Sequence, residues 1–187
     1  MGLTVYIIHG ANANPNANWF PWLKKELKSL NINVIVPAFP IREQQTLDKW
    51  LSTFSKFIDD LDENSIMIGH SLGPAFIFNV LERIKTEIRA CFLVAPFAND
   101  LGITKYDSIN HTFYEVGFDW NTIRNRSKRF YVYASDNDPH VPMGISKSIA
   151  TKLDAKFELI HDGGHLNAES GYVKFTLLLE DLKKEIS

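Results

Sequence analysis

The sequence holds a single cysteine, Cys91, among its 187 residues. One thiol excludes an intramolecular disulfide framework and a cysteine-rich zinc site. Long apolar runs are also missing, since stretches such as 90–96 fall far short of the roughly 20 residues that a membrane-spanning helix needs. Neither sign of charge dominates, because 20 basic and 22 acidic side chains leave a formal net charge of −2. We therefore expect neither nucleic acid nor a membrane surface as a partner.

The N-terminal segment 3–8 is apolar, but no basic region precedes it, so it does not match a secretory signal peptide. No repeat, low-complexity tract or flexible linker divides the chain, and its length suits one domain. Histidines and carboxylates do not converge in a metal-binding spacing. We expect a single cytoplasmic domain spanning residues 1–187, with no metal or other cofactor.

Short apolar runs alternate with longer amphipathic stretches along the chain. The runs are rich in Val, Ile, Phe or Tyr at consecutive positions, as strands buried on both faces of a parallel sheet are. They cover residues 3–8, 33–36, 65–68, 90–95, 129–134 and 156–160. Helical spacing of apolar residues predicts helices over 19–30, 47–61, the residues after Ser71, 143–153 and 172–186. This alternation predicts an α/β fold of three layers, in which helices cover both faces of an open, parallel, six-stranded sheet.

Residues 97–120 break this alternation, since they carry aromatic side chains without a clear period. A connection of this length within a compact domain is usually functional or disordered, and aromatic residues argue against disorder. Two interpretations stay open: a partial lid over the carboxyl edge of the sheet, or an irregular helix packed on the sheet.

Sites in open parallel sheets form at the carboxyl ends of the strands. The third apolar run is followed by Gly69-His70-Ser71-Leu72-Gly73, which fits the pattern G-x-S-x-G. In this pattern the serine occupies a strained strand-to-helix turn, and side chains at the flanking glycines would collide with the adjacent strand and helix. The turn raises the hydroxyl above the sheet, beside the positive end of the next helix. We predict that Ser71 is a nucleophile and not a helix cap.

A serine nucleophile needs an imidazole base that a carboxylate orients. The fifth run is followed by two candidate carboxylates, Asp136 and Asp138. Asp138 is favoured because Pro139 and Pro142 would stiffen the loop around it, whereas Asp136 lies nearer the strand end and suits a turn.

The sixth run is followed by two candidate bases, His161 and His165. His165 is favoured because Gly163 and Gly164 can adopt positive φ and turn the chain back toward Ser71. A neutral imidazole there can accept the serine proton and return it to a leaving group. The resulting order of Ser, Asp and His along the chain is that of the α/β-hydrolases.

In that fold the oxyanion hole combines the N–H after the nucleophile with one from the loop after the first strand. These positions are Leu72 and either Ala11 or Asn12. His9, at the end of the first run, is expected to shape this turn and not to act as a base.

Three aromatic residues are candidates for an apolar acyl pocket, namely Trp19, Phe97 and Phe113. Their alternative is a place in the core.

The chain resembles the small serine hydrolases grouped with retinoblastoma-binding protein nine and the bacterial YdeN-type proteins. The resemblance covers nearly the whole chain, and its tryptophan-containing second segment is the most diagnostic. The shared segments are Ile7-Ile8-His9-Gly10, Asn18-Trp19-Phe20-Pro21-Trp22-Leu23-Lys24-Lys25, Gly69-His70-Ser71-Leu72-Gly73, Leu93-Val94 with Phe97-Ala98, Asp138-Pro139-His140-Val141-Pro142 and Gly163-Gly164-His165. The resemblance implies a reduced α/β-hydrolase fold without a large cap domain, and a triad of Ser71, His165 and Asp138.

The function expected from these residues is hydrolysis of small carboxylic esters through an acyl-enzyme. A thioesterase or a peptidase would use the same triad, and a binding protein that has lost turnover is the alternative outside enzymes. The family's link to the retinoblastoma protein does not carry over, because no LxCxE-type segment surrounds Cys91. The protein partner is therefore unknown, and the expected substrate is a small-molecule ester.

Overall fold

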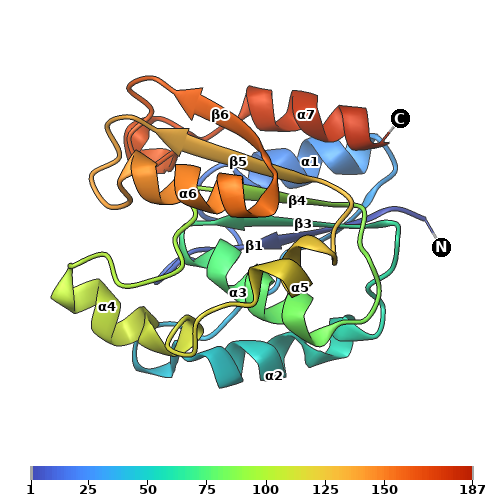
Figure 1. Ribbon diagram of the computed structural model, residues 1–187. Coiled ribbons are helices and arrows are strands. Elements are labelled where there is room, and N and C mark those ends of the chain that lie inside the picture. Colours follow the sequence, from blue (N-terminus) through green and yellow to red (C-terminus); the bar gives the residue numbers. More distant parts are fainter. Residues whose placement is uncertain (1, 187) are drawn as a thin grey trace.

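A six-stranded sheet forms the centre of the molecule in the computed structural model, which describes residues 2–186 (Figure 1). The strands are β1 (Thr4–Ile8), β2 (Asn33–Ile35), β3 (Ser65–His70), β4 (Ala90–Val94), β5 (Phe130–Ser135) and β6 (Lys156–Ile160). Their order is β2-β1-β3-β4-β5-β6, and every neighbouring pair is parallel. The prediction of six parallel strands in one open sheet is confirmed. β3 continues two residues beyond its predicted end, through His70.

The strand register brings the carboxyl ends of the strands to one edge. Ile8 of β1 lies opposite Gly69 of β3, and His70 lies opposite Val94 of β4. Ser135 of β5 is likewise paired with Ile160 of β6. The loops that follow these strands therefore emerge on the same side of the molecule, where a site can assemble from distant segments.

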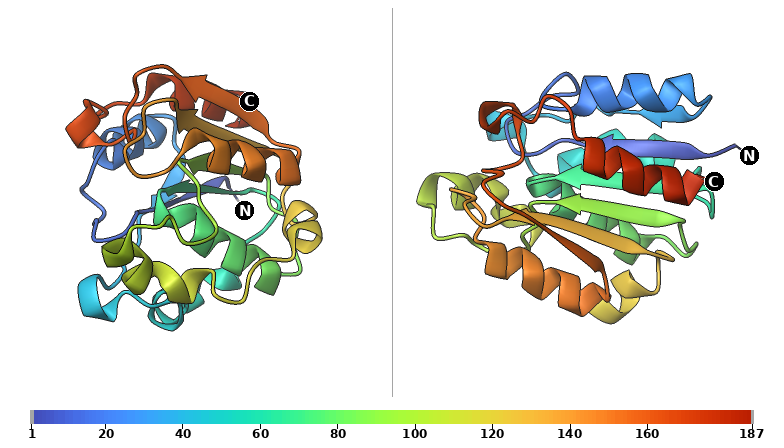
Figure 2. Two further views of the ribbon diagram at one scale, coloured as in Figure 1. Left: turned by 60° about the vertical axis from the view of Figure 1, so that its left-hand side comes forward. Right: turned by 90° about the horizontal axis from the view of Figure 1, so that it is seen from above.

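Helices cover both faces of the sheet (Figure 2). α1 (Phe20–Ser29) and α7 (Thr176–Ile186) pack on one face, and α2 (Leu47–Ile58), α3 (Leu72–Arg83) and α6 (Met143–Leu153) on the other. Alternate residues of β1 divide between the two cores, with Val5 in the first and Tyr6 in the second, as the pleat of a strand requires. All five predicted helices are present, although α7 begins at Thr176 instead of residue 172.

Residues 97–120 form short helical elements joined by irregular segments. The elements are α4 (Thr104–Asn110), the 3₁₀ turn η2 (His111–Phe113) and the start of α5 (Trp120–Arg124). Two further 3₁₀ turns, η1 (Arg42–Gln44) and η3 (Ala168–Ser170), lie in other loops.

α7 carries two buried carboxylates that face the sheet. Asp181 accepts a hydrogen bond from the Tyr133 hydroxyl at 2.8 Å, and Glu185 accepts one from the Tyr131 hydroxyl. Lys156 pairs with Asp181 at 3.0 Å, so charge and hydrogen bonds join α7 to β5 and β6. None of the helices in the described residues is both long enough and apolar enough to cross a membrane.

Candidate active site

Ser71 occupies the turn between β3 and α3, with φ 59° and ψ −106°. L residues rarely adopt this conformation, and such strain concentrates at functional sites. The Ser71 N–H donates to the Val94 carbonyl at 2.9 Å, which ties the turn to β4. A Cβ atom at Gly69 would lie 2.7 Å from the Pro74 nitrogen, and one at Gly73 would lie 2.6 Å from the Ile8 carbonyl oxygen. Both flanking positions therefore require glycine.

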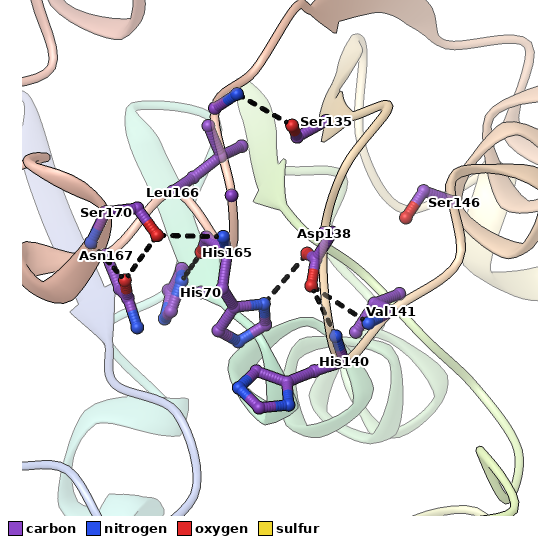
Figure 3. A network of polar contacts seen from close by, with 12 residues as sticks. His70, Ser135, Asp138, His140, Val141, Ser146, His165, Leu166, Asn167 and Ser170 are labelled. Carbon is purple, nitrogen blue, oxygen red and sulfur yellow. Dashed lines mark hydrogen bonds and ion pairs between the residues drawn. The ribbon is translucent and has the colours of Figure 1, made fainter.

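His165 and Asp138 form a hydrogen-bonded pair from two different loops (Figure 3). The His165 Nδ1 lies 2.8 Å from the Asp138 Oδ2, and the Asp138 side chain is 1% exposed. Its other oxygen, Oδ1, accepts the N–H groups of His140 and Val141 at 2.8 and 3.0 Å. Burial raises the pKa of the Asp138 carboxyl, but the hydrogen bonds from His165 and the two N–H groups outweigh burial and hold that pKa below its ordinary value. The carboxylate is thus ionised and fixed in orientation.

The two competing candidates, Asp136 and His161, pair with each other instead. The His161 Nδ1 lies 2.6 Å from the Asp136 Oδ2, and the His161 side chain is 79% exposed. The four candidates therefore form two pairs, one buried and one on the surface.

Two preceding glycines and one hydrogen bond fix the backbone around His165. Gly164 has a positive φ of 54°, as expected, but Gly163 is needed for space: a Cβ there would lie 2.8 Å from the Ile160 and Leu166 side chains. The His165 N–H donates to the Ser170 Oγ at 3.1 Å.

The ring of His70, at the end of β3, contacts the backbone of His165, and no sequence pattern predicted this contact. The His70 Nε2 donates to the His165 carbonyl at 2.9 Å. Burial, followed by the neighbouring His165, lowers the pKa of His70 to about 3, so this ring is neutral. His70 is the variable second position of G-x-S-x-G, and only its place at the end of a buried strand could have indicated this role.

The loop after β1 approaches Ser71 closely. A Cβ at Gly10 would lie 3.0 Å from the Ser71 Cβ, which is a tight contact that a side chain here would strain. His9 is buried, its Nδ1 donates to the Gly10 carbonyl at 2.8 Å, and its Nε2 accepts the Phe39 N–H at 3.2 Å. Burial lowers the pKa of His9. This histidine shapes the turn, as expected from the sequence.

The residues predicted for an oxyanion hole are Ala11 and Asn12 in this loop and Leu72 directly after Ser71, and their N–H groups differ in their hydrogen bonds. The Asn12 N–H donates to the Gln45 Oε1 at 2.8 Å. The Ala11 N–H has no acceptor among the hydrogen bonds of the described residues. Leu72 is the first residue of α3, and N–H groups of a first helical turn have no partner within the helix.

Comparison with known proteins places this chain in a family. The model of the family described as serine hydrolase matches residues 5–184. The chain belongs to this serine hydrolase family. It is 32% identical over 185 residues to the Bacillus subtilis protein YdeN, described as a hydrolase, covering 98% of this chain and 96% of YdeN.

Two further comparisons agree with the family assignment. The serine hydrolase RBBP9 of Rattus norvegicus is 26% identical over 156 residues, which cover 79% of this chain and 77% of RBBP9. The crystal structure of the B. subtilis YdeN gene product superposes with a TM-score of 0.91 and 31% identity, over 98% of each chain. The esterase domain of a Rhodothermus marinus protein, at 15% identity and a TM-score of 0.71 over 98% of this chain and 86% of that domain, shares the fold.

A cavity of about 350 Å³ in this serine hydrolase is lined by two of the three predicted catalytic residues, while Asp138 lies behind His165. Ser71, His165 and the loop 10–12 line it. The His140 ring, 4.9 Å from the His165 ring, lines it as well. Residues Leu101, Tyr106 and Asn110 also line the cavity, so part of the segment 97–120 borders the site. The described residues contain no group of three or more His, Cys, Asp or Glu side chains that could hold a metal ion.

Of the three aromatic residues predicted for an acyl pocket, the structure places one at the cavity. Phe97 lines it, but Trp19 and Phe113 do not. Trp19 is buried beneath the loop of His165, and its indole N–H donates to the Leu166 carbonyl at 3.1 Å. Phe113 packs edge-to-face on Trp50, 4.9 Å between ring centroids. Both rings stabilise the core, which was their alternative interpretation.

Proposed function

We propose that this serine hydrolase cleaves carboxylic esters of small molecules through an acyl-enzyme. The observation that carries the proposal is that His165, paired with the buried Asp138, lines one cavity with a serine in a strained turn. A serine needs no such backbone strain to cap a helix, whereas a nucleophile must be raised to the substrate.

The proposed reaction begins with attack of the Ser71 Oγ on the acyl carbonyl. His165 takes the serine proton on Nε2 while Asp138 holds Nδ1–H and stabilises the imidazolium. The N–H groups of Leu72 and Ala11 bind the oxyanion, since the Asn12 N–H is engaged by Gln45. His165 then passes the proton to the leaving alkoxide as the ester C–O bond breaks, and water releases the acid by the same route.

The size of the cavity supports a small substrate. About 350 Å³ is at the lower end of the range for small-molecule sites. We therefore expect short acyl chains to be hydrolysed faster than long ones.

The test is intact-mass measurement after incubation with a fluorophosphonate, for the native chain and for Ser71→Ala. One adduct on the native chain and none on Ser71→Ala is expected, together with hydrolysis of p-nitrophenyl acetate and butyrate by the native chain only. His165→Ala should also abolish hydrolysis. A folded native chain that takes no adduct and hydrolyses no ester would overturn the proposal. An adduct with turnover only of thioesters or peptides would overturn the ester assignment.

A further inference from the structure

Gln45 is a polar side chain that is buried in the interior of the molecule. It lies in the loop between η1 and α2, far in sequence from the proposed triad, and it is 1% exposed. Burying an amide is unfavourable unless its groups are paired, so the two ends of this side chain define what it does.

Each end of the Gln45 amide holds a different part of the cavity wall. Its Oε1 accepts the Asn12 N–H at 2.8 Å, and its Nε2 donates to the Asn110 Oδ1 at 2.7 Å. The orientation of the amide is determined, because a flipped amide would set its NH₂ against the Asn12 N–H. Asn12 and Asn110 both line the cavity.

The loop that Gln45 holds has a demanding conformation. Asn12 has a positive φ of 52°, in a turn closed by the Ala13 N–H and the Gly10 carbonyl at 3.3 Å. The segment that contains Gln45 also contacts the Asn12 side chain, because the Asn12 Oδ1 accepts the Arg42 N–H at 3.2 Å. Tethers on both the backbone and the side chain of Asn12 fix the Ala11–Asn12 peptide. The Gly10 carbonyl that accepts the Ala13 N–H belongs to the preceding peptide, which carries the Ala11 N–H, so this turn holds both peptides.

We propose that Gln45 is a positioning residue for the oxyanion hole, acting through Asn12 to aim the Ala11 N–H, and that it links this loop to α4. The inference rests on the proposed function, because an oxyanion hole has a role only if Ser71 attacks a carbonyl. Gln45 touches no reacting atom. A donor must lie within a few tenths of an ångström of its productive position to stabilise the transition state, and Gln45 sets that position.

The experiment compares Gln45→Met, Gln45→Glu and the matched control Gln44→Met, whose site is the neighbouring exposed residue. Active serines are counted by fluorophosphonate labelling, and kcat and KM for p-nitrophenyl acetate are given per active serine. Methionine fills the space without polar groups, so kcat falls by about 10- to 100-fold with KM changed by less than about threefold. Glutamate keeps an acceptor for the Asn12 N–H, and Asn110 can turn its NH₂ toward the second oxygen, so Gln45→Glu stays within about fivefold of native. Gln44→Met behaves as native.

A second readout separates positioning from mere stability. The Ki of an alkyl trifluoromethyl ketone, whose hemiketal oxyanion uses the same donors, rises in Gln45→Met by the factor that kcat falls. A structural role would lower the melting temperature and the number of active serines, but leave kcat per active serine unchanged. That result, or a Gln45→Glu as impaired as Gln45→Met, overturns the inference.

The outcome remains decisive if Gln45→Met does not fold. Asn110→Ala then removes the acceptor at the far end of the linkage; a several-fold lower kcat supports the inference, and an unchanged kcat overturns it. A native chain without esterase activity would overturn the proposed function itself. An active native chain whose Gln45→Met is unimpaired would overturn the inference alone.

Discussion

Replacing Asp138 by asparagine tests the orientation of His165 with almost no change in shape. The Asp138 Oδ1 accepts two backbone N–H groups, from His140 and Val141. In Asp138→Asn the amide oxygen keeps these bonds, so the NH₂ group takes the position 2.8 Å from the His165 Nδ1. A donor there forces Nδ1 to accept, which places the imidazole proton on Nε2, and the ring then has no lone pair for the serine proton.

The expected loss in kcat is about 10⁴-fold, or roughly 5.5 kcal/mol in transition-state stabilisation, as for the same change in a known Ser-His-Asp triad. The assay is the initial rate on p-nitrophenyl acetate, with circular dichroism to show that the variant is folded. Asp136→Asn is the matched control, because it breaks a His–Asp pair of similar length on the surface, and it should stay within about twofold of native. More than about a tenth of native activity in Asp138→Asn, or an equal loss in Asp136→Asn, would refute the reasoning.

Three further predictions concern the fold and the substrate. Gly73→Ala should lower the free energy of unfolding in urea by about 3 kcal/mol, because its Cβ would meet a β1 carbonyl at 2.6 Å, whereas Gly144→Ala meets nothing within 4 Å and should be neutral or slightly stabilising. Burial raises the pKa of the Asp181 carboxyl, but the hydrogen bonds from Lys184, Lys156 and Tyr133 lower this pKa by more. The net pKa of Asp181 therefore lies below its ordinary value. Its carboxylate therefore stabilises the fold above about pH 4 and loses this effect as the pH falls through the folded-state pKa. Asp181→Asn should cost about 2 kcal/mol at pH 7 in urea titrations and progressively less below pH 4, with Glu180→Gln as the exposed control. Glu169 is an acidic side chain among the described residues that line the cavity, so kcat/KM for p-nitrophenyl hemisuccinate should be about three- to fivefold below that for the butyrate ester, and Glu169→Gln should remove the difference.

Each of these predictions can fail in a specific way. Equal unfolding free energies for the two glycine variants would show that the strand–helix contact can relax. A pH profile of Asp181→Asn parallel to that of the native chain would remove the carboxylate from the acid transition. Equal hydrolysis of both esters would show that the carboxylate of the substrate does not approach the acidic side chain.

The strands could be predicted well because a parallel sheet buries both of its faces. Consecutive apolar residues mark such strands directly, so each predicted strand lies within a few residues of its observed position. The end of β3 was missed because Gly69 and His70 do not continue the apolar run, and the burial of His70 comes from tertiary contacts with the His165 carbonyl and with the rings of Trp19 and Phe20.

The helical part of the chain was predictable wherever one long face packs on the sheet. The segment 97–120 was not, because α4 and η2 are each too short for a hydrophobic period to develop. The role of its aromatic residues depends on packing partners such as Trp50 for Phe113, which lie far away in sequence.

The candidate site likewise has one part that the sequence predicts and another that it does not. The pattern G-x-S-x-G around Ser71 predicts the geometry of the strand-to-helix turn, and glycine or proline spacing favours Asp138 and His165 over their neighbours. The link from Asn12 through Gln45 to Asn110 joins two loops and the end of α4, and no local pattern in the sequence connects residues so far apart.

The backbone strain at Ser71 lowers the stability of the fold at the same residue that the proposed reaction uses as its nucleophile. A non-glycine residue at φ 59° and ψ −106° costs on the order of 1–3 kcal/mol, which glycine would largely avoid. Ser71→Gly should therefore unfold at a higher temperature than the native chain while losing all turnover. In a chain retained only as a scaffold, glycine at this position would give the more stable fold. The presence of serine is therefore a thermodynamic argument against a purely structural role.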